Sequence, residues 1–184
     1  VFMVTIIFES HGTTYDNEAN LSSGWYDVEL SELGKRQAKE LGERYKEDPL
    51  DVIFCSDLKR SYETVEIAFE RRNIPIIKDK NLRECNYGDL TRHASEEVEP
   101  IKVKYIEEPF PNGESYEQTT ERMKFFLKNL VKEYNGKKVM IIGHRATQYG
   151  LEYWIKKIPL KEIVAAPWKW QPGWTYYLEE MGEK

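Results

Sequence analysis

The sequence predicts an α/β fold with a mostly parallel central sheet and helices on both faces. Short apolar runs rich in β-branched residues, such as residues 2–8, are typical of parallel strands that are buried on both faces. Longer stretches with an apolar stripe of helical period separate these runs. Strands that alternate with helices long enough for crossover connections favour a parallel sheet.

The elements follow one another in a regular order along the chain. Strands are expected at residues 2–8, 51–55, 75–78, 139–142 and 174–178, the last of them at an edge of the sheet. Helices are expected at residues 31–47, 58–69, 116–134 and 147–156. Ser115 and Gln118 resemble a capping box, which predicts that the long third helix begins after Ser115.

Residues 91–111 interrupt this rhythm. The segment is acidic and irregular, and Pro109 and Pro111 close it. We expect a lid-like insertion that covers one end of the sheet, within a single domain that spans residues 1–184.

Composition restricts the classes of partner. The 27 Lys and Arg residues are interleaved with 32 Asp and Glu residues, and the net charge is −5. A protein that binds nucleic acid needs a clustered basic face, so this pattern argues against such a partner. No apolar run approaches the roughly 20 residues of a membrane span, and Cys55 and Cys85 do not form a metal-type pair. We expect a cytoplasmic protein without a membrane partner.

Three predicted strands end in residues that carry chemistry. Residues 9–12 read ESHG, residues 56–60 read SDLKR, and residues 143–145 read GHR. The carboxyl ends of parallel strands meet at one edge, so two of the three histidines should converge there. A further extended segment ending in Leu82-Arg83-Glu84 would add a carboxylic acid. A histidine that attacks phosphorus needs a neutral ring, cations for the phosphoryl oxygens and an acid for the leaving group, and this edge offers each.

Four motifs, in order, resemble the histidine phosphatase superfamily, the phosphoglycerate mutase-like group. They are FESHGTTYDNEANLSSGWYDVELSELGKRQA at residues 8–38, SDLKRSYET at 56–64, LRE at 82–84 and GHRAT at 143–147. The resemblance spans nearly the whole chain and implies the phosphoglycerate mutase-like fold. It also implies a phosphohistidine mechanism with no metal and no cofactor.

The resemblance assigns roles to individual residues. His11 would be the phosphate-accepting nucleophile, and His144 would stabilise the transferred phosphoryl group. Arg60 and Asn17 would hold its oxygens, while Glu84 would protonate the leaving oxygen. The remaining residues that we group with substrate binding are Ser10, Thr14 and Arg145.

One position departs from the family pattern. The family has an arginine directly before the nucleophilic histidine, and this chain has Ser10. Losing one such contact to a developing oxyanion typically costs about 3–4 kcal/mol. We hypothesise that Arg145, which follows His144, restores the missing cation; the other interpretation is an arginine that pairs with a surface glutamate.

Several functions remain open at this point. The short chain favours a phosphomonoesterase acting on a small phosphorylated metabolite over a phosphoglycerate mutase-type phosphotransferase. A catalytically impaired protein that only binds a phospholigand is the alternative that Ser10 raises. A metal hydrolase lacks a supporting motif. Trp168 and Trp170 are expected at the rim of the site. Neither the substrate nor a homo-oligomeric state can be read from the sequence.

Overall fold

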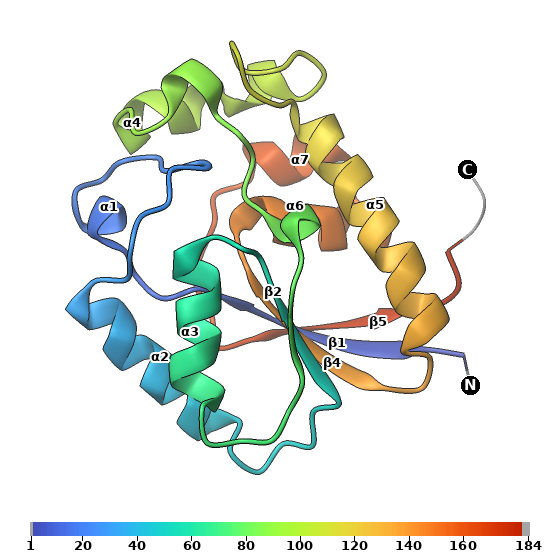
Figure 1. Ribbon diagram of the computed structural model, residues 1–184. Coiled ribbons are helices and arrows are strands. Elements are labelled where there is room, and N and C mark those ends of the chain that lie inside the picture. The colour runs from blue at the N-terminus through green and yellow to red at the C-terminus, as the bar shows by residue number, and fades with distance from the viewer. Residues whose placement is uncertain (1, 182–184) are drawn as a thin grey trace.

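A five-stranded sheet with the strand order β3-β2-β4-β1-β5 forms the centre of the computed structural model, which describes residues 2–181 (Figure 1). The strands are β1 (Val4–Ser10), β2 (Val52–Cys55), β3 (Ile76–Lys78), β4 (Lys138–Gly143) and β5 (Trp174–Leu178). β1 to β4 pair in parallel, and β5 runs antiparallel to β1 at one edge. The predicted fold class and the edge position of the last strand are therefore confirmed.

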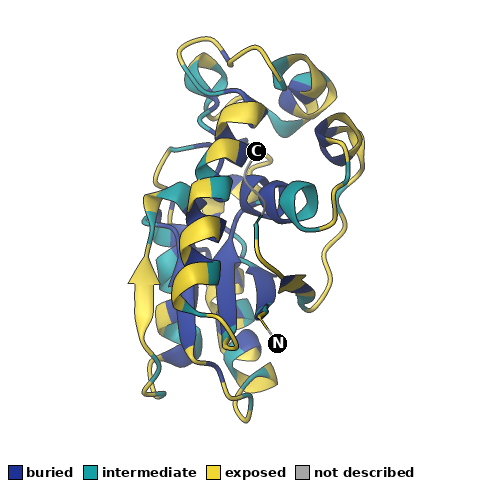
Figure 2. Ribbon diagram, turned by 90° about the vertical axis from the view of Figure 1, so that its right-hand side faces the viewer, coloured by how far each residue is buried: buried dark blue, intermediate teal, exposed yellow. Residues whose placement is uncertain are grey.

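Alternate residues of the strands enter two separate apolar layers. Ile6 and Phe8 of β1 pack with α5 (Tyr116–Glu133) and α6 (Arg145–Trp154), whereas Ile7 packs with α2 (Glu32–Arg44) and α3 (Lys59–Phe69). Figure 2 shows the central strands buried and one exposed strand at the edge, as expected for β3, whose three residues are all exposed. The near-continuous apolar runs in the sequence follow from burial on both faces.

Helix boundaries are set by capping residues. The hydroxyl of Ser115 accepts from the Gln118 backbone N–H, and the Gln118 side chain accepts from the Ser115 backbone N–H, which confirms the capping box before α5. Ser31 caps α2 in a related way, by accepting from Gly34 N–H. The observed helices begin and end within a few residues of the predicted ranges.

Several short elements were not predicted. They are α1 (Tyr15–Glu18), α4 (Ser95–Val98), α7 (Leu160–Ala165) and the 3₁₀ helices η1 (Lys80–Leu82), η2 (Gly88–Leu90) and η3 (Glu99–Tyr105). η1 corrects one prediction: Glu84 follows a 3₁₀ turn and not an extended segment. Asp79 starts this turn because its carboxylate accepts from Asn81 N–H. Elements of three to seven residues are too short to show an apolar period.

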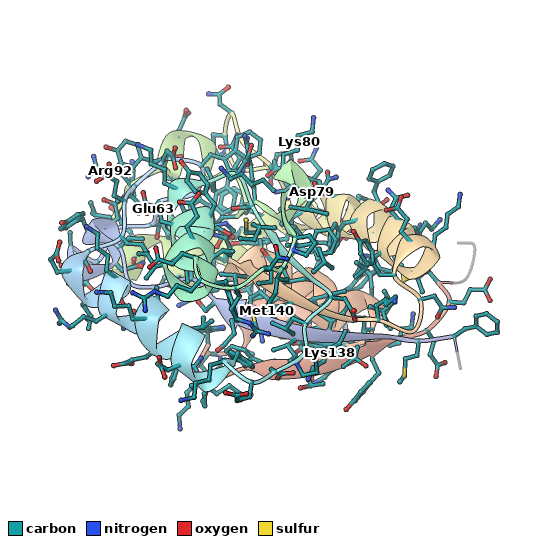
Figure 3. The ribbon with its side chains drawn as sticks, turned by 60° about the horizontal axis from the view of Figure 1, so that its bottom comes forward. Glu63, Asp79, Lys80, Arg92, Lys138 and Met140 are labelled. Carbon is teal, nitrogen blue, oxygen red and sulfur yellow. The ribbon has the colours of Figure 1, made fainter. Side chains whose placement is uncertain are left out.

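The segment 91–111 lies beyond the carboxyl ends of the strands. It contains α4 and η3, and a β-bridge joins Ala94 to Leu21 in the loop after α1. Arg92 forms an ion pair with the buried Asp16 of α1, which fastens the segment to that helix as well. In Figure 3, Arg92 lies across the molecule from Lys138, the first residue of β4. No helix within residues 2–181 is long and apolar enough to cross a membrane.

Candidate functional site

The ends of β1 and β4 bring two histidines together. Ser10 pairs with Gly143 in the sheet register, and the backbone N–H of His11 donates to Gly143 O at 3.1 Å. The rings of His11 and His144 lie with their centroids 5.1 Å apart and their planes inclined at 58°. The predicted convergence of the two histidines is confirmed.

A glycine next to His11 allows close packing behind the site. A Cβ atom at Gly12 would lie 2.5 Å from the carbonyl oxygen of Gly34 in α2. The loop after β1 therefore packs directly against the first turn of α2. This contact fixes the backbone on which the His11 side chain is mounted.

His11 is held as a neutral ring. Its Nδ1 lies 2.7 Å from the carbonyl oxygen of Gly12, so Nδ1 carries the proton and donates to that oxygen. Burial lowers the pKa of His11 to about 3, with a further lowering by the nearby Arg60 guanidinium. Nε2 thus keeps a free lone pair at neutral pH, as a nucleophile requires.

His144 is fully buried between the sheet and α6. Its Nε2 lies 2.7 Å from Ser56 Oγ, and its side chain also accepts from the Thr147 backbone N–H in a capping box at the start of α6. Burial, together with Arg60 and His11, lowers the pKa of His144 well below its usual range. Ser56 is a residue that the sequence reasoning missed: the motif SDLKR contained it, but nothing in the sequence pointed to a contact with His144.

Arg60 supplies a buried cation beside the two rings. Only 3% of the residue is exposed, and its Nη2 and Nη1 donate to the carbonyl oxygens of Gly24 at 2.6 Å and Tyr26 at 3.0 Å. Gly24 adopts a positive φ of 55°, a conformation that glycine reaches without strain. The loop at residues 24–26 therefore orients the guanidinium that the sequence assigned to this site.

Glu84 reaches the same edge from the loop after η1. Its Oε1 accepts from Cys85 N–H at 2.8 Å and from Ala146 N–H at 3.2 Å, in the first turn of α6. The backbone of Glu84 is fixed by Trp25, whose indole N–H donates to Glu84 O at 2.7 Å, and by Arg122. Trp25 thus has a structural role, because it fixes the backbone that carries Glu84.

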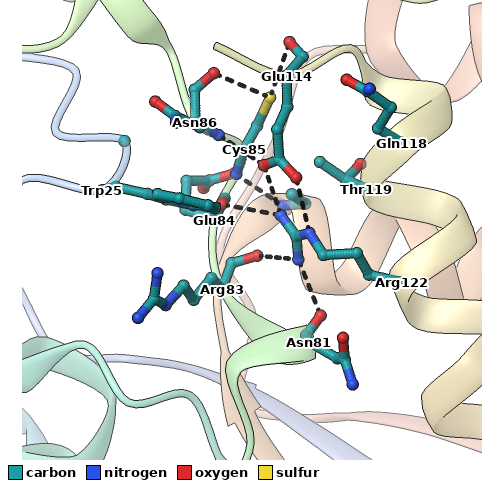
Figure 4. A network of polar contacts seen from close by, with 12 residues as sticks. Trp25, Asn81, Arg83, Glu84, Cys85, Asn86, Glu114, Gln118, Thr119 and Arg122 are labelled. Atoms are coloured by element: carbon teal, nitrogen blue, oxygen red, sulfur yellow. Dashed lines mark hydrogen bonds and ion pairs between the residues drawn. The ribbon is translucent and has the colours of Figure 1, made fainter.

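Figure 4 shows how Arg122 of α5 organises this loop. Its guanidinium donates to the backbone carbonyl oxygens of Asn81, Arg83 and Glu84, and pairs with Glu114 at 2.8 Å. One side chain therefore binds three backbone carbonyl groups within residues 81–84 of the acid-bearing loop. The sequence carried no signal for this contact, because Arg122 lies in a different predicted element.

A pocket of about 560 Å³ opens above these residues. The predicted site residues that line it are Ser10, His11, Asn17, Arg60, Glu84 and Arg145, and the rim tryptophans Trp168 and Trp170 line it as well. His144 does not line the pocket and is only 1% exposed. Thr14 does not line the pocket either. It is fully buried, and its hydroxyl caps α1 by accepting from Asn17 N–H, while Thr13 lines the pocket in its place.

Arg145 lies in the pocket wall as an ion-paired side chain. Its Nη1 donates to Glu99 Oε1 at 2.8 Å, and the guanidinium lies over the Trp168 ring. Lys102 of η3 binds the same Glu99 oxygen at 2.9 Å and is only 2% exposed. The pairing with Glu99 matches the second sequence interpretation of Arg145, although the residue also borders the pocket.

A second ion pair in the pocket was not foreseen. Both carboxylate oxygens of Glu9, two residues before the nucleophile, accept from Nη2 of Arg44 at the end of α2. Burial raises the pKa of Glu9 to about 7, although the Arg44 charge opposes the rise. Arg44 also lies over the Trp170 ring. Among the described residues, no group of three or more His, Cys, Asp or Glu side chains is placed to hold a metal ion.

Comparison with known proteins gives consistent matches. The model of the histidine phosphatase superfamily (branch 1) matches residues 6–172. The uncharacterised phosphatase PhoE of Bacillus subtilis is 34% identical over 149 residues, which cover 81% of this chain and 76% of that protein. A 2,3-bisphosphoglycerate-dependent phosphoglycerate mutase of Cytophaga hutchinsonii is 30% identical over 174 residues, with 88% and 81% covered. The solved structure of Bacillus stearothermophilus YhfR superimposes with a TM-score of 0.81 at 27% identity, covering 96% of this chain and 91% of that chain.

The low pKa of His11 can be tested by NMR. An imidazole in the unfolded chain takes up a proton near pH 6.5, whereas folded His11 stays neutral until the pH approaches about 3. Its contribution to stability is therefore complete above pH 6.5 and is lost as the pH falls toward 3. Long-range ¹H–¹⁵N spectra, assigned with His11→Gln, should show neutral His11 nitrogens from pH 8 to pH 5. A His11 titration with its midpoint above pH 5 would contradict this.

Proposed function

The chain belongs to the histidine phosphatase superfamily (branch 1), and from this premise we propose that it is a phosphomonoesterase acting on a small phosphorylated metabolite. The reaction proceeds through a phosphohistidine on His11. The observation that carries the proposal is the pair of neutral rings 5.1 Å apart beside Arg60, with His11 and Arg60 both lining the pocket.

The first step is attack on phosphorus. Nε2 of His11 forms the N–P bond while the P–O bond to the leaving alcohol breaks, and Glu84 gives its proton to the leaving oxygen. In the second step water attacks the phosphohistidine, Glu84 takes a proton from that water, and His11 is released. Glu84 thus returns to its initial protonated state, and the net reaction is hydrolysis of the ester.

The phosphoryl oxygens are held by fixed donors. Ser56 Oγ and the Thr147 backbone N–H fix the ring of His144, whose centroid lies 5.1 Å from that of His11. Arg60 adds a permanent positive charge that is already oriented by backbone carbonyl oxygens.

Arg145 would supply the cation that Ser10 lacks. On β1, Ser10 alternates with Glu9 and so points to the sheet face that carries α6, the helix in which Arg145 is the first residue. Arg145 lines the pocket and remains 34% exposed, so its guanidinium can turn from Glu99 to a bound dianion. The charge of Lys102 then stays on Glu99 and keeps that carboxylate paired.

A phosphoglycerate mutase-type phosphotransferase is the second candidate, and the phosphoglycerate mutase relatives favour it. A mutase must exclude water from the phosphohistidine between its two half-reactions. In this pocket Arg44 and Arg145 are 32% and 34% exposed, which supports access of water and therefore hydrolysis. A catalytically impaired protein that only binds a phospholigand is the third candidate, raised by Ser10.

Replacement of His11 tests the nucleophile. His11→Ala should lower the rate of phosphate release from p-nitrophenyl phosphate by at least about a thousandfold, because His11 is the only histidine among the described residues that lines the pocket. The matched control is His93→Ala, which changes the third histidine, outside the pocket, and should leave the rate unchanged. Both proteins are assayed with EDTA present. Residual activity above a few per cent in His11→Ala would refute the covalent role.

Replacement of Arg145 tests the compensating cation. Arg145→Ala should reduce kcat by about 100-fold, the usual cost of removing one donor to a developing oxyanion. The control Arg71→Ala removes an exposed arginine outside the pocket. A loss smaller than threefold would leave Arg145 without this role. In the converse variant Ser10→Arg, kcat should rise little, because a second guanidinium would compete for the same oxygens.

Incubation with 3-phosphoglycerate separates hydrolysis from phosphotransfer. We expect inorganic phosphate as the product, because water reaches the phosphohistidine before the acid can rebind. Phosphate release and the two phosphoglycerate isomers are followed by ³¹P NMR. Formation of 2-phosphoglycerate without free phosphate would replace the phosphatase assignment with the mutase.

A further inference from the structure

The pocket is much larger than a phosphoryl group. Its volume of about 560 Å³ falls within the ~300–1,000 Å³ that is usual for pockets that enclose a small organic ligand. In the proposed reaction the phosphoryl group occupies only the part of this pocket beside His11 and Arg60. The rest of the pocket is available to the alcohol part of the ester, so the residues that line it indicate which kind of alcohol it can bind.

Charges outside the phosphoryl site are paired within the protein. Arg44 holds Glu9, and Lys102 holds Glu99, which Arg145 leaves when it turns to the phosphoryl group. With Glu40, which also lines the pocket, three carboxylates then face two cations. At pH 8, above the pKa of Glu9, this wall therefore has no surplus of positive charge. A second anionic group on the substrate would meet no surplus of positive charge here, and Glu9 and Glu99 would repel it.

Paired charges remain strong hydrogen-bonding groups. A hydroxyl can accept from a guanidinium and donate to its partner carboxylate at the same time, without breaking the ion pair. Uncharged polar residues complete this lining: Thr13, Asn17, Ser22, Ser23, Gln37 and Ser95. The wall is thus suited to a neutral ligand that carries several hydroxyl groups.

Two tryptophans provide flat apolar surface in the same wall. Trp168 is fixed by a 3.0 Å hydrogen bond from its indole N–H to Gln148 Oε1, and Arg145 covers one side of its ring. Trp170 lies beside Arg44 and is 55% exposed. An aromatic wall can pack against the C–H surface of a ring whose hydroxyls bind the polar groups around it.

From this lining we infer that the leaving group is a neutral polyhydroxylated alcohol, so that the substrate is a sugar phosphate or a similar polyol phosphate. The inference rests on the proposed function, because it concerns the alcohol released from His11. It also separates this pocket from one built for a phosphoglycerate, whose carboxylate would need an unpaired cation.

A substrate panel at pH 8 tests the inference. The wild-type chain is assayed with glucose 6-phosphate, ribose 5-phosphate, 3-phosphoglycerate, O-phosphoserine and p-nitrophenyl phosphate. We expect kcat/KM for the better sugar phosphate to exceed that for either carboxylated ester by at least about tenfold, since unmatched polar or charged groups cost this much or more. An equal or higher value for a carboxylated ester would overturn the inference.

The variant Glu99→Gln tests whether the negative charge of Glu99 disfavours a substrate with a second anionic group. It leaves Lys102 and Arg145 without their carboxylate, so the wall gains one positive charge. The ratio of kcat/KM for glucose 6-phosphate over 3-phosphoglycerate should fall by about tenfold, equivalent to about 1.4 kcal/mol, chiefly through a lower KM for 3-phosphoglycerate. The control Glu96→Gln removes an exposed charge of α4 outside the pocket and should not move the ratio.

The outcomes distinguish this inference from the proposed function. Hydrolysis of p-nitrophenyl phosphate without preference for sugar phosphates would refute the inference and leave the phosphatase intact. Absence of hydrolysis for every ester would refute the phosphatase, and the inference with it. An unchanged ratio in a folded Glu99→Gln protein, checked by circular dichroism, would refute the role of the paired charges. If that variant does not fold, the wild-type panel decides alone.

Discussion

The pairing of β1 with β4 is the constraint on which the site depends. Their register sets Ser10 opposite Gly143, and a histidine follows each of these two residues. Both histidines therefore lie at the same edge of the sheet. The hydrogen bond from His11 N–H to Gly143 O continues the ladder by one step and holds the two backbones together at this point. A slip of one residue in this pairing would turn each side chain of the strand to the opposite face of the sheet. The packing of the apolar layers on both faces therefore also maintains the register that brings the two histidines together.

Both imidazoles are kept neutral by their surroundings, and this is a matter of electrostatics as well as burial. A protonated ring beside the Arg60 guanidinium would place two positive charges together in a poorly solvated space, which is costly. In the proposed reaction a phosphoryl dianion would reverse this balance by bringing negative charge to Arg60. On that proposal the site is organised for an anion in advance, as electrostatic preorganisation requires.

The walls of the pocket come from parts of the chain that are distant in sequence. The segment of α4 and η3 supplies Glu99 and Lys102, while the loop before β5 supplies Trp168 and Trp170. Arg145, directly after His144, joins the two walls because it binds Glu99 and lies over Trp168. Arg145 therefore connects the part of the pocket beside the two histidines to the walls that, in the proposed reaction, would contact the alcohol part of the substrate.

The sequence by itself determined the α/β fold class, the main strands and helices, and the meeting of His11, His144, Arg60 and Glu84 at one edge. These features are local, because the apolar period, the capping residues and the ends of the strands are determined by residues that are close together in the sequence. Only the tertiary structure decided the pairing of Arg145 with Glu99, the contact of Ser56 with His144, the burial of Thr14 and the ion pair of Glu9 with Arg44. Such contacts join residues separated by about thirty to ninety positions, or depend on turns too short to have a period, so they arise from packing and carry no local pattern.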